Sequence, residues 1–189
     1  MFKQSGPAFA HVPAFKYKSA IMTSLTVDIR PASSRDADQI ADVHAAAWRN
    51  AYEGLIPHKS LQSMIGRRHT GWWQRAIARG TSVMVIDMGG LIAGYCTFGL
   101  NRARALPQEG EIYELYIQPE YQGIGLGTML FDAAQASLKN HGCDGLVVWA
   151  LEDNAMAMRF YEGHGGRDIA QGFETFENRP LRKVAFVWQ

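Results

Sequence analysis

The stretch YQGIGLGTML (residues 121–130) decides the fold, because it places three glycines at alternate positions and then continues as a helical pattern. A strand pattern, EIYELYI (residues 111–117), precedes it, and Pro119 marks the end of that strand. Backbone N–H groups in the first turn of a helix lack partners within the helix, and glycines let an anion approach them closely. The stretch therefore predicts a strand, a glycine-rich turn and a helix with an anion site at its start. A turn that only connects the strand to the helix is the alternative.

Two common nucleotide-binding motifs do not fit this segment. A Walker loop requires a lysine followed by serine or threonine, which the segment lacks. A dinucleotide fingerprint that begins at Gly123 would need a third glycine where Thr128 stands. The remaining interpretation is a diphosphate site that uses backbone N–H groups without a lysine or a metal.

The composition favours one globular domain. With 189 residues, of which 47% are hydrophobic and 20% charged, the chain can bury one substantial core. The formal net charge of +1 argues against nucleic acid or a membrane surface as a partner. Cys96 and Cys143 lie far apart and are interpreted as buried thiols of a reducing compartment. The histidines show no metal-ligand spacing, so no metal site is expected.

The first 24 residues differ from the rest, because they contain no acidic residue and no long apolar run. We expect residues 1–24 to be a terminal arm and residues 25–189 to be the domain. An organelle transit peptide, or a start at Met22, is the alternative. No stretch approaches the ~20 apolar residues that span a bilayer, so a soluble, cytoplasmic protein is expected.

Hydrophobic periodicity predicts an alternation of strands and helices along the whole domain. The predicted strands are residues 25–32, 81–87, 91–100, 111–117, 145–151 and 181–189, and the predicted helical segments are residues 34–54, 59–77, 126–142 and 154–166. This order is typical of an α/β (α+β) fold in which helices flank a mixed sheet.

A second motif follows the glycine segment after one helix and one strand, and the pair resembles the GNAT family, the GCN5-related N-acetyltransferases. Gln122, Gly125 and Gly127 match the family's Q/R-x-x-G-x-G/A loop for acetyl-CoA, and NAMAMRFYEGHG (residues 154–165) resembles its second signature. The likeness covers about residues 27–188. It implies a single domain with a mixed, mostly antiparallel central sheet flanked by helices.

The resemblance also implies which residues hold acetyl-CoA, the expected cosubstrate. Backbone groups of one strand would meet the pantetheine arm and the thioester, and the glycine loop would hold the pyrophosphate. The implied residues are Leu115, Tyr116 and Ile117 on the strand, Gln122, Gly123, Ile124, Gly125, Leu126, Gly127 and Thr128 in the loop, and Asn154 beside the cofactor arm.

Acetyl transfer to an amine needs a base, because an alkylammonium group has a pKa near ~10.4 and must lose a proton before it attacks. Glu111 and Glu114 are the candidate bases, and the resemblance places the base of histone-type relatives at about Glu111. Side chains alternate along a strand, so at most one of the two is expected to face the substrate unless a bulge intervenes. A salt bridge on the strand is the alternative role for either glutamate.

Two further requirements concern the carbonyl oxygen and the leaving thiolate. Unpaired N–H groups at Leu115 and Tyr116 would stabilise the oxyanion. The resemblance implies that Tyr161 is the general acid, with an aromatic side chain packed on an apolar helix face as the alternative. The sequence departs from the family pattern at Gly166, where many members have phenylalanine, and at Trp149, which stands near a glutamate position of some relatives.

Aromatic residues in the first two helical segments suggest an acceptor pocket. Trp48, Tyr52, Trp72 and Trp73 lie where the resemblance implies that the acceptor binds. Packing in the core is the alternative and is more common at helical spacing.

These observations predict an N-acetyltransferase that moves acetyl from acetyl-CoA to a primary amine by direct attack in a ternary complex. Neither motif contains a cysteine, so a covalent acetyl-enzyme is not implied. The acceptor would be a small-molecule amine or a protein N-terminus. A non-catalytic acyl-CoA sensor or partner subunit is the alternative. A homodimer is also expected, with the edge of the terminal strand KVAFVWQ (residues 183–189) as its interface.

Overall fold

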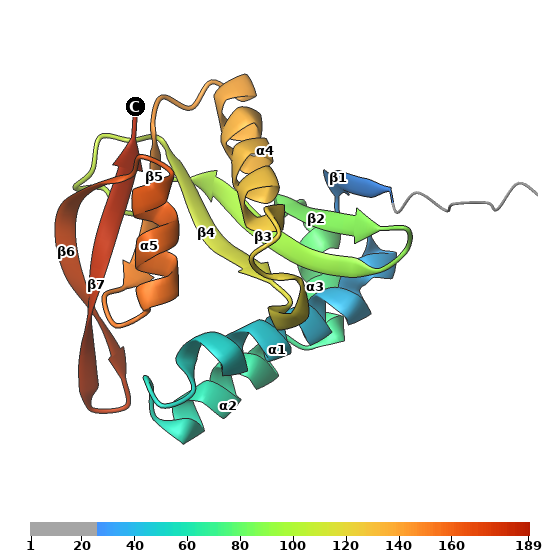
Figure 1. Ribbon diagram of the computed structural model, residues 1–189, viewed down its shortest axis with the longest axis horizontal. Helices are drawn as coiled ribbons and strands as arrows, with labels where there is room; N and C mark the ends of the chain where they lie inside the picture. The colour runs from blue at the N-terminus through green and yellow to red at the C-terminus, as the bar shows by residue number, and fades with distance from the viewer. Residues whose placement is uncertain (1–25) are drawn as a thin grey trace, which may run out of the picture.

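The computed structural model describes residues 26–189, and the expected arm at residues 1–24 lies outside them. A seven-stranded sheet in the order β1-β2-β3-β4-β5-β7-β6 forms the centre (Figure 1). Only β4 and β5 pair in parallel, and every other neighbouring pair is antiparallel. The predicted mixed, mostly antiparallel sheet is confirmed. Its strands are β1 (Val27–Pro31), β2 (Val83–Met88), β3 (Ile92–Leu100), β4 (Gly110–Ile117), β5 (Leu146–Leu151), β6 (Arg167–Phe176) and β7 (Arg179–Trp188).

Helices cover both faces of this sheet. They are α1 (Ala37–Tyr52), α2 (His58–Arg67), α3 (Thr70–Ala78), α4 (Leu126–Asn140) and α5 (Ala155–Gly163). The helices α4 and α5 lie side by side on one face, where Leu130 and Phe131 are buried (Figure 1). On the other face, Ile40 of α1 and Trp73 of α3 pack against Tyr95 of β3. Within residues 26–189, no helix combines the length and the apolar character needed to cross a bilayer.

The predicted continuous helix at 59–77 is wrong, because the chain breaks at Arg68 and His69 into α2 and α3. His69 has an extended backbone, with φ −72° and ψ 166°, and precedes the first residue of α3. The two helices pack in different places: Leu61 of α2 joins Leu181 of β7, whereas Trp73 of α3 lies under β2 and β3. Tertiary packing therefore overrides the continuous helical pattern.

Strand β6 was not predicted from the sequence. It pairs only with β7 and most of its side chains are exposed, so it carries little of the apolar alternation that marks a half-buried strand. Its presence at the edge also corrects the expected interface, because β7 lies between β5 and β6 and has no free edge. A homodimer stays a prediction.

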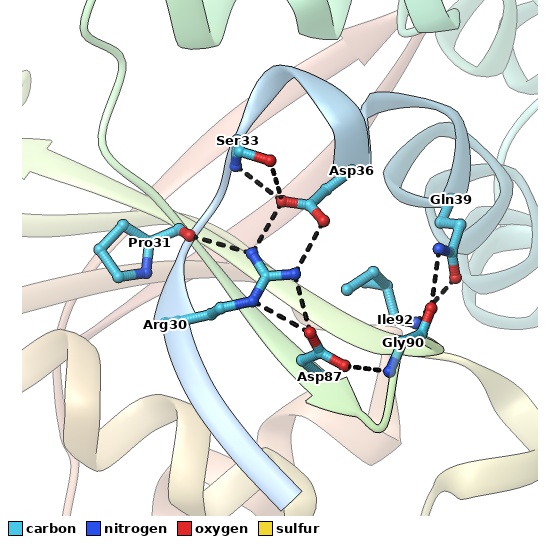
Figure 2. Close-up of polar contacts among 8 residues, drawn as sticks. All are labelled: Arg30, Pro31, Ser33, Asp36, Gln39, Asp87, Gly90 and Ile92. Atoms are coloured by element: carbon cyan, nitrogen blue, oxygen red, sulfur yellow. Dashed lines mark hydrogen bonds and ion pairs between the residues drawn. The ribbon is translucent and has the colours of Figure 1, made fainter.

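An ion-pair network fixes the start of α1 against the sheet (Figure 2). Arg30 of β1 donates to both carboxylate oxygens of Asp36, each at 2.8 Å, and its Nε donates to Asp87 of β2 at 3.0 Å. Hydrogen bonds from Arg30 and Ser33 hold the pKa of the buried Asp36 carboxyl down, at about 2. Further along α1, Gln39 donates to the carbonyl of Gly90 at 3.1 Å in the turn between β2 and β3. The network sets the direction of α1, whose other end lies over the site described next.

Candidate active site

A pocket opens where β4 and β5 diverge. The two strands pair at only three positions, from Gly110 with Leu146 to Ile112 with Val148. Both strands continue beyond these pairs, so their facing backbone groups are left without ladder partners there. The pocket has a volume of about 510 Å³ and is lined by β4, β5, the start of α4, one side of α5 and the end of α1.

Most of the sequence-predicted site residues line this pocket. They are Glu114, Leu115, Tyr116, Ile117, Gln122, Gly123, Gly125, Gly127, Thr128, Asn154 and Tyr161. Three predicted residues are not in the lining. Ile124 is 65% exposed in the loop, and Leu126, the first residue of α4, is buried in the core. Glu111 forms an ion pair with Arg102.

The glycine loop owes its shape to Gly123 and Gly125. Their φ angles of 78° and 90° lie in the left-handed region, and a methyl group added to either would meet nothing within 4 Å. Gln122 donates from Nε2 to the carbonyl of Ile117 at 3.1 Å, which ties the loop to the end of β4. The loop thus keeps open space in front of the first turn of α4.

Gly127 has a different role, because it lies inside the first turn of α4 and its φ is not positive. A methyl group on Gly127 would lie 3.2 Å from the ring of Phe160. This glycine therefore sets how closely α4 approaches α5.

The start of α4 suits a diphosphate. The first N–H groups of a helix have no intrahelical partner and carry the positive end of the helix dipole. In α4 these N–H groups come directly after Gly125, which lines the pocket. The Arg159 side chain of α5 also lines the pocket and adds a positive charge. Open backbone, helix N–H groups and one arginine together fit the diphosphate of a coenzyme.

Glu114 lines the pocket with an ion pair behind it. Its Oε1 lies 3.0 Å from Nη2 of Arg68, and its Oε2 lies 3.4 Å from the hydroxyls of Tyr95 and Thr97. The Arg68 guanidinium in turn lies 3.8 Å above the ring of Trp72. Arg68 was missed by sequence reasoning, because nothing local links it to a glutamate 46 residues away.

Glu111 lies on the same face of the sheet as Glu114. Glu111 pairs with Gly99 and Glu114 with Thr97, two residues apart on β3, because the register shifts between Thr97 and Phe98. The bulge that was needed to place both carboxylates on one face is therefore present. Glu111 is only 3% exposed, however, and it accepts hydrogen bonds from the Arg102 backbone and guanidinium at 2.7–3.2 Å.

Tyr161 of α5 and Asn154, which directly precedes α5, are two of the pocket residues. The Tyr161 side chain is buried among aromatic rings, including those of Phe131 and Phe186, and burial raises the pKa of its hydroxyl well above the usual range. Asn154 precedes the first residue of α5 and accepts a hydrogen bond from the Ala157 N–H at 3.2 Å. Both residues line the pocket, and their roles toward a cofactor stay predictions.

Of the four aromatic residues predicted to form an acceptor pocket, only Tyr52 lines the pocket. Its hydroxyl lies 3.1 Å from that of Tyr116. Trp48 and Trp73 are buried in the helix–sheet cores, and Trp72 packs at their edge. Residue type and position along the helices could not separate these roles, because which aromatic side chain faces the pocket depends on how the helices pack on the sheet.

The structure explains one of the two departures from the family pattern, Gly166, and places the other, Trp149, in the pocket lining. A methyl group on Gly166 would lie 2.6 Å from the indole of Trp188, so this ring occupies the space beside Gly166. Trp149 lines the pocket on β5, and the ammonium of Lys183 lies 5.1 Å from the centre of its ring.

Comparison with known proteins agrees with this geometry. The sequence profile of the Acetyltransferase (GNAT) family matches residues 40–165. The chain is 28% identical over 162 residues to the uncharacterized N-acetyltransferase YuaI of Bacillus subtilis, which covers 86% of this chain and 92% of that protein. It is 22% identical over 142 residues to the spermidine N(1)-acetyltransferase of Thermoplasma acidophilum, which covers 75% and 88% of the two chains.

A solved structure shares the fold. The crystal structure of the PaiA N-acetyltransferase of Thermoplasma acidophilum in complex with coenzyme A matches with a TM-score of 0.66 at 17% identity. The match covers 84% of this chain and 98% of that chain.

Proposed function

Since the chain belongs to the acetyltransferase (GNAT) family, we propose that it transfers acetyl from acetyl-CoA to a primary amine by direct attack of the amine. The observation that carries the proposal is one pocket that joins the first turn of α4 to Glu114 of β4 and Tyr161 of α5. Acetyl-CoA supplies the acetyl group as a reactive thioester. The relatives named N-acetyltransferases and the neighbour with bound coenzyme A support this assignment.

The chain's contribution to cofactor binding follows from two sets of backbone groups. The loop from Gln122 to Thr128 would hold the diphosphate with N–H groups and with the Arg159 side chain. The edge of β4 from Leu115 to Ile117 faces the gap and would bind the amide groups of the pantetheine arm as a further strand would. Asn154 lines the pocket beside that arm.

Glu114 is the proposed base. Its carboxylate lines the pocket, whereas the Glu111 carboxylate is held by Arg102 outside the lining. Glu114 would take the proton of the acceptor ammonium, directly or through water. The Arg68 guanidinium, at 3.0 Å, keeps this carboxylate in place.

Two further groups would act on the thioester of acetyl-CoA, one on its carbonyl oxygen and one on its sulfur. Of the N–H groups of Leu115 and Tyr116, the one that points away from β3 into the gap between β4 and β5 would stabilise negative charge on the carbonyl oxygen. The Tyr161 hydroxyl stays protonated across the working pH range, because burial raises its pKa. It would therefore donate a hydrogen bond to the departing sulfur and deliver its proton only as charge accumulates there.

The proposed acceptor is a small primary amine. The lining outside the anion site contains one carboxylate, Glu114, together with neutral side chains such as Tyr52 and Trp149, which suits a cationic amine. The name of the spermidine N(1)-acetyltransferase relative supports the same chemical class. A protein N-terminus is the second acceptor to test. The pocket lining contains neither Cys96 nor Cys143, in keeping with direct attack.

Calorimetric titration of acetyl-CoA, followed by thiol release over an amine panel that starts with spermidine, tests the proposal. We expect binding to the wild type and its loss in Gly125→Glu, which puts a carboxylate at the anion site. Gly142→Glu is the matched control, because Gly142 also has a left-handed φ, of 84°, but lies at the other end of α4. Binding without turnover on any amine or peptide would favour the non-catalytic sensor. Absence of binding to the wild type would refute the proposal.

A further inference from the structure

His164 connects the end of α5 to the anion site at the start of α4. Its Nε2 lies 2.9 Å from Oγ1 of Thr128, in the first turn of α4, and its Nδ1 lies 2.7 Å from the carbonyl oxygen of Phe160. Thr128 lines the pocket, whereas His164 is not part of the lining and is half-buried. The imidazole therefore contacts a hydroxyl of the pocket wall without lining the pocket itself.

The direction of these hydrogen bonds follows from the partners. The Phe160 carbonyl can only accept, so Nδ1 carries a hydrogen. In a neutral imidazole Nε2 is then an acceptor, and the single hydrogen of the Thr128 hydroxyl is donated to it. In this state Thr128 offers only lone pairs to an anion in the pocket.

A second proton on the imidazole reverses the bond to Thr128. Both ring nitrogens of a histidine cation donate, so Nε2–H would donate to Oγ1 and the hydroxyl hydrogen would be free to donate into the pocket. The added positive charge also favours an anion at the same place. The protein would thus exchange an acceptor for a donor at Thr128 without moving the backbone.

The side chains packed against His164 are neutral. Thr128 and Phe131 face it from α4, Phe160 lies 4.1 Å away ring to ring on α5, and the Trp188 indole of β7 donates to its backbone carbonyl at 2.8 Å. All four side chains are uncharged. Glu162 and Arg167, the nearest charged residues along the chain, are exposed, and within residues 26–189 no ion pair involves His164. Arg159 and Glu114 are the charged side chains of the pocket lining.

We propose that His164 takes up a proton from solvent when the diphosphate of acetyl-CoA binds at the first turn of α4, and that Thr128 thereby becomes a donor to the diphosphate. The inference rests on the proposed function, since it requires acetyl-CoA in this pocket. His164 is a positioning residue that acts through Thr128. By linkage, a coenzyme A thioester that lacks the 3′-phosphate should bind about tenfold more tightly at pH 6 than at pH 8.

The test measures proton uptake by calorimetry. Acetyl-3′-dephospho-CoA is titrated in buffers of different ionisation enthalpy, because this ligand keeps the diphosphate and lacks the phosphate monoester that titrates near pH ~6. We expect net proton uptake by the wild type, its loss in His164→Gln and a smaller uptake in Thr128→Val. The two substitutions break one hydrogen bond from its two ends, so the double variant should bind no more weakly than the weaker single variant.

His141→Gln is the matched control. His141 Nδ1 also lies 2.7 Å from a carbonyl oxygen four residues earlier, that of Ser137, but at the far end of α4. This variant should keep the uptake and the pH dependence. If His164 only stabilises the end of α5, His164→Gln will lower the melting temperature and leave proton uptake unchanged, which overturns the inference. Binding of acetyl-3′-dephospho-CoA without proton uptake by the wild type overturns it as well. Absence of any acetyl-CoA binding overturns the proposed function itself, and this inference with it.

Discussion

The Arg68 guanidinium lies 3.0 Å from the Glu114 carboxylate, so an arginine between α2 and α3 holds a glutamate of β4 at the edge of the pocket. Glu114 lies where β4 and β5 have diverged, whereas Glu111 lies where they still pair. One carboxylate is therefore accessible to an acceptor and the other is enclosed. The first prediction depends on this difference.

Replacement of Glu114 by glutamine should lower kcat/KM for the amine by about 100-fold, the effect typical of a lost general base. The affinity for acetyl-CoA should change by less than about twofold, because the anion site is formed by other elements. Steady-state kinetics and calorimetry check the two expectations. Glu111→Gln is the matched control and should retain most of the activity. If Glu111→Gln abolishes turnover in a folded protein while Glu114→Gln does not, the base has been assigned to the wrong glutamate.

Replacement of Tyr161 by phenylalanine should lower kcat by about 100-fold with little change in acetyl-CoA affinity, since only the departing sulfur loses a hydrogen-bond donor. Phenylalanine keeps the ring packing against Phe131 and Phe186, so the fold should be preserved. Single-turnover kinetics separate the chemical step from binding. An unchanged rate for the chemical step would show that another donor, such as water, protonates the thiolate.

The glycines of the loop should respond differently to alanine. Gly125→Ala forces a side chain into a left-handed conformation at φ 90° and should cost ~1–2 kcal/mol of stability. Gly127→Ala leaves φ favourable but places a methyl group 3.2 Å from the Phe160 ring, so the ring or the helix must shift by a few tenths of an ångström. We expect Gly127→Ala to cost more free energy of acetyl-CoA binding than free energy of unfolding. Phe160→Leu in the same chain should restore part of the binding, and no restoration would argue against this contact.

Because of the Arg30 network, the free energy of unfolding should fall at acid pH. The pKa of Asp36 is about 2 in the folded protein against ~3.9 in an unfolded chain, so its stabilisation is present above pH ~3.9 and is lost as pH falls towards 2. Asp36→Asn should lower the free energy of unfolding at pH 7 by ~1–3 kcal/mol and flatten the fall below pH 4. Denaturant unfolding at several pH values measures both effects. An equally steep fall in the variant would assign the acid sensitivity to other carboxylates.

The sequence alone was enough to predict the proposed anion site, because that site depends on local geometry. The left-handed φ angles of Gly123 and Gly125 lie directly before the start of α4, and Asn154 and Tyr161 belong to one short helical segment. Each of the two motifs therefore arises within its own short stretch of chain. Backbone conformation and helical period act over that distance, so motif spacing carries the information. The mixed sheet was predictable for a similar reason, since most of its strands have a clear apolar pattern.

Only the tertiary structure decided which of these groups meet. The contacts from Arg68 to Glu114 and from His164 to Thr128 join residues that lie far apart in the chain. The break between α2 and α3 and the exposed edge strand β6 have no clear local sequence pattern. The bulge near Tyr113 likewise moved Glu111 and Glu114 to one face, although their spacing in a regular strand places them on opposite faces. Strand register and packing between elements depend on the whole core, and for that reason no short stretch of sequence contains them.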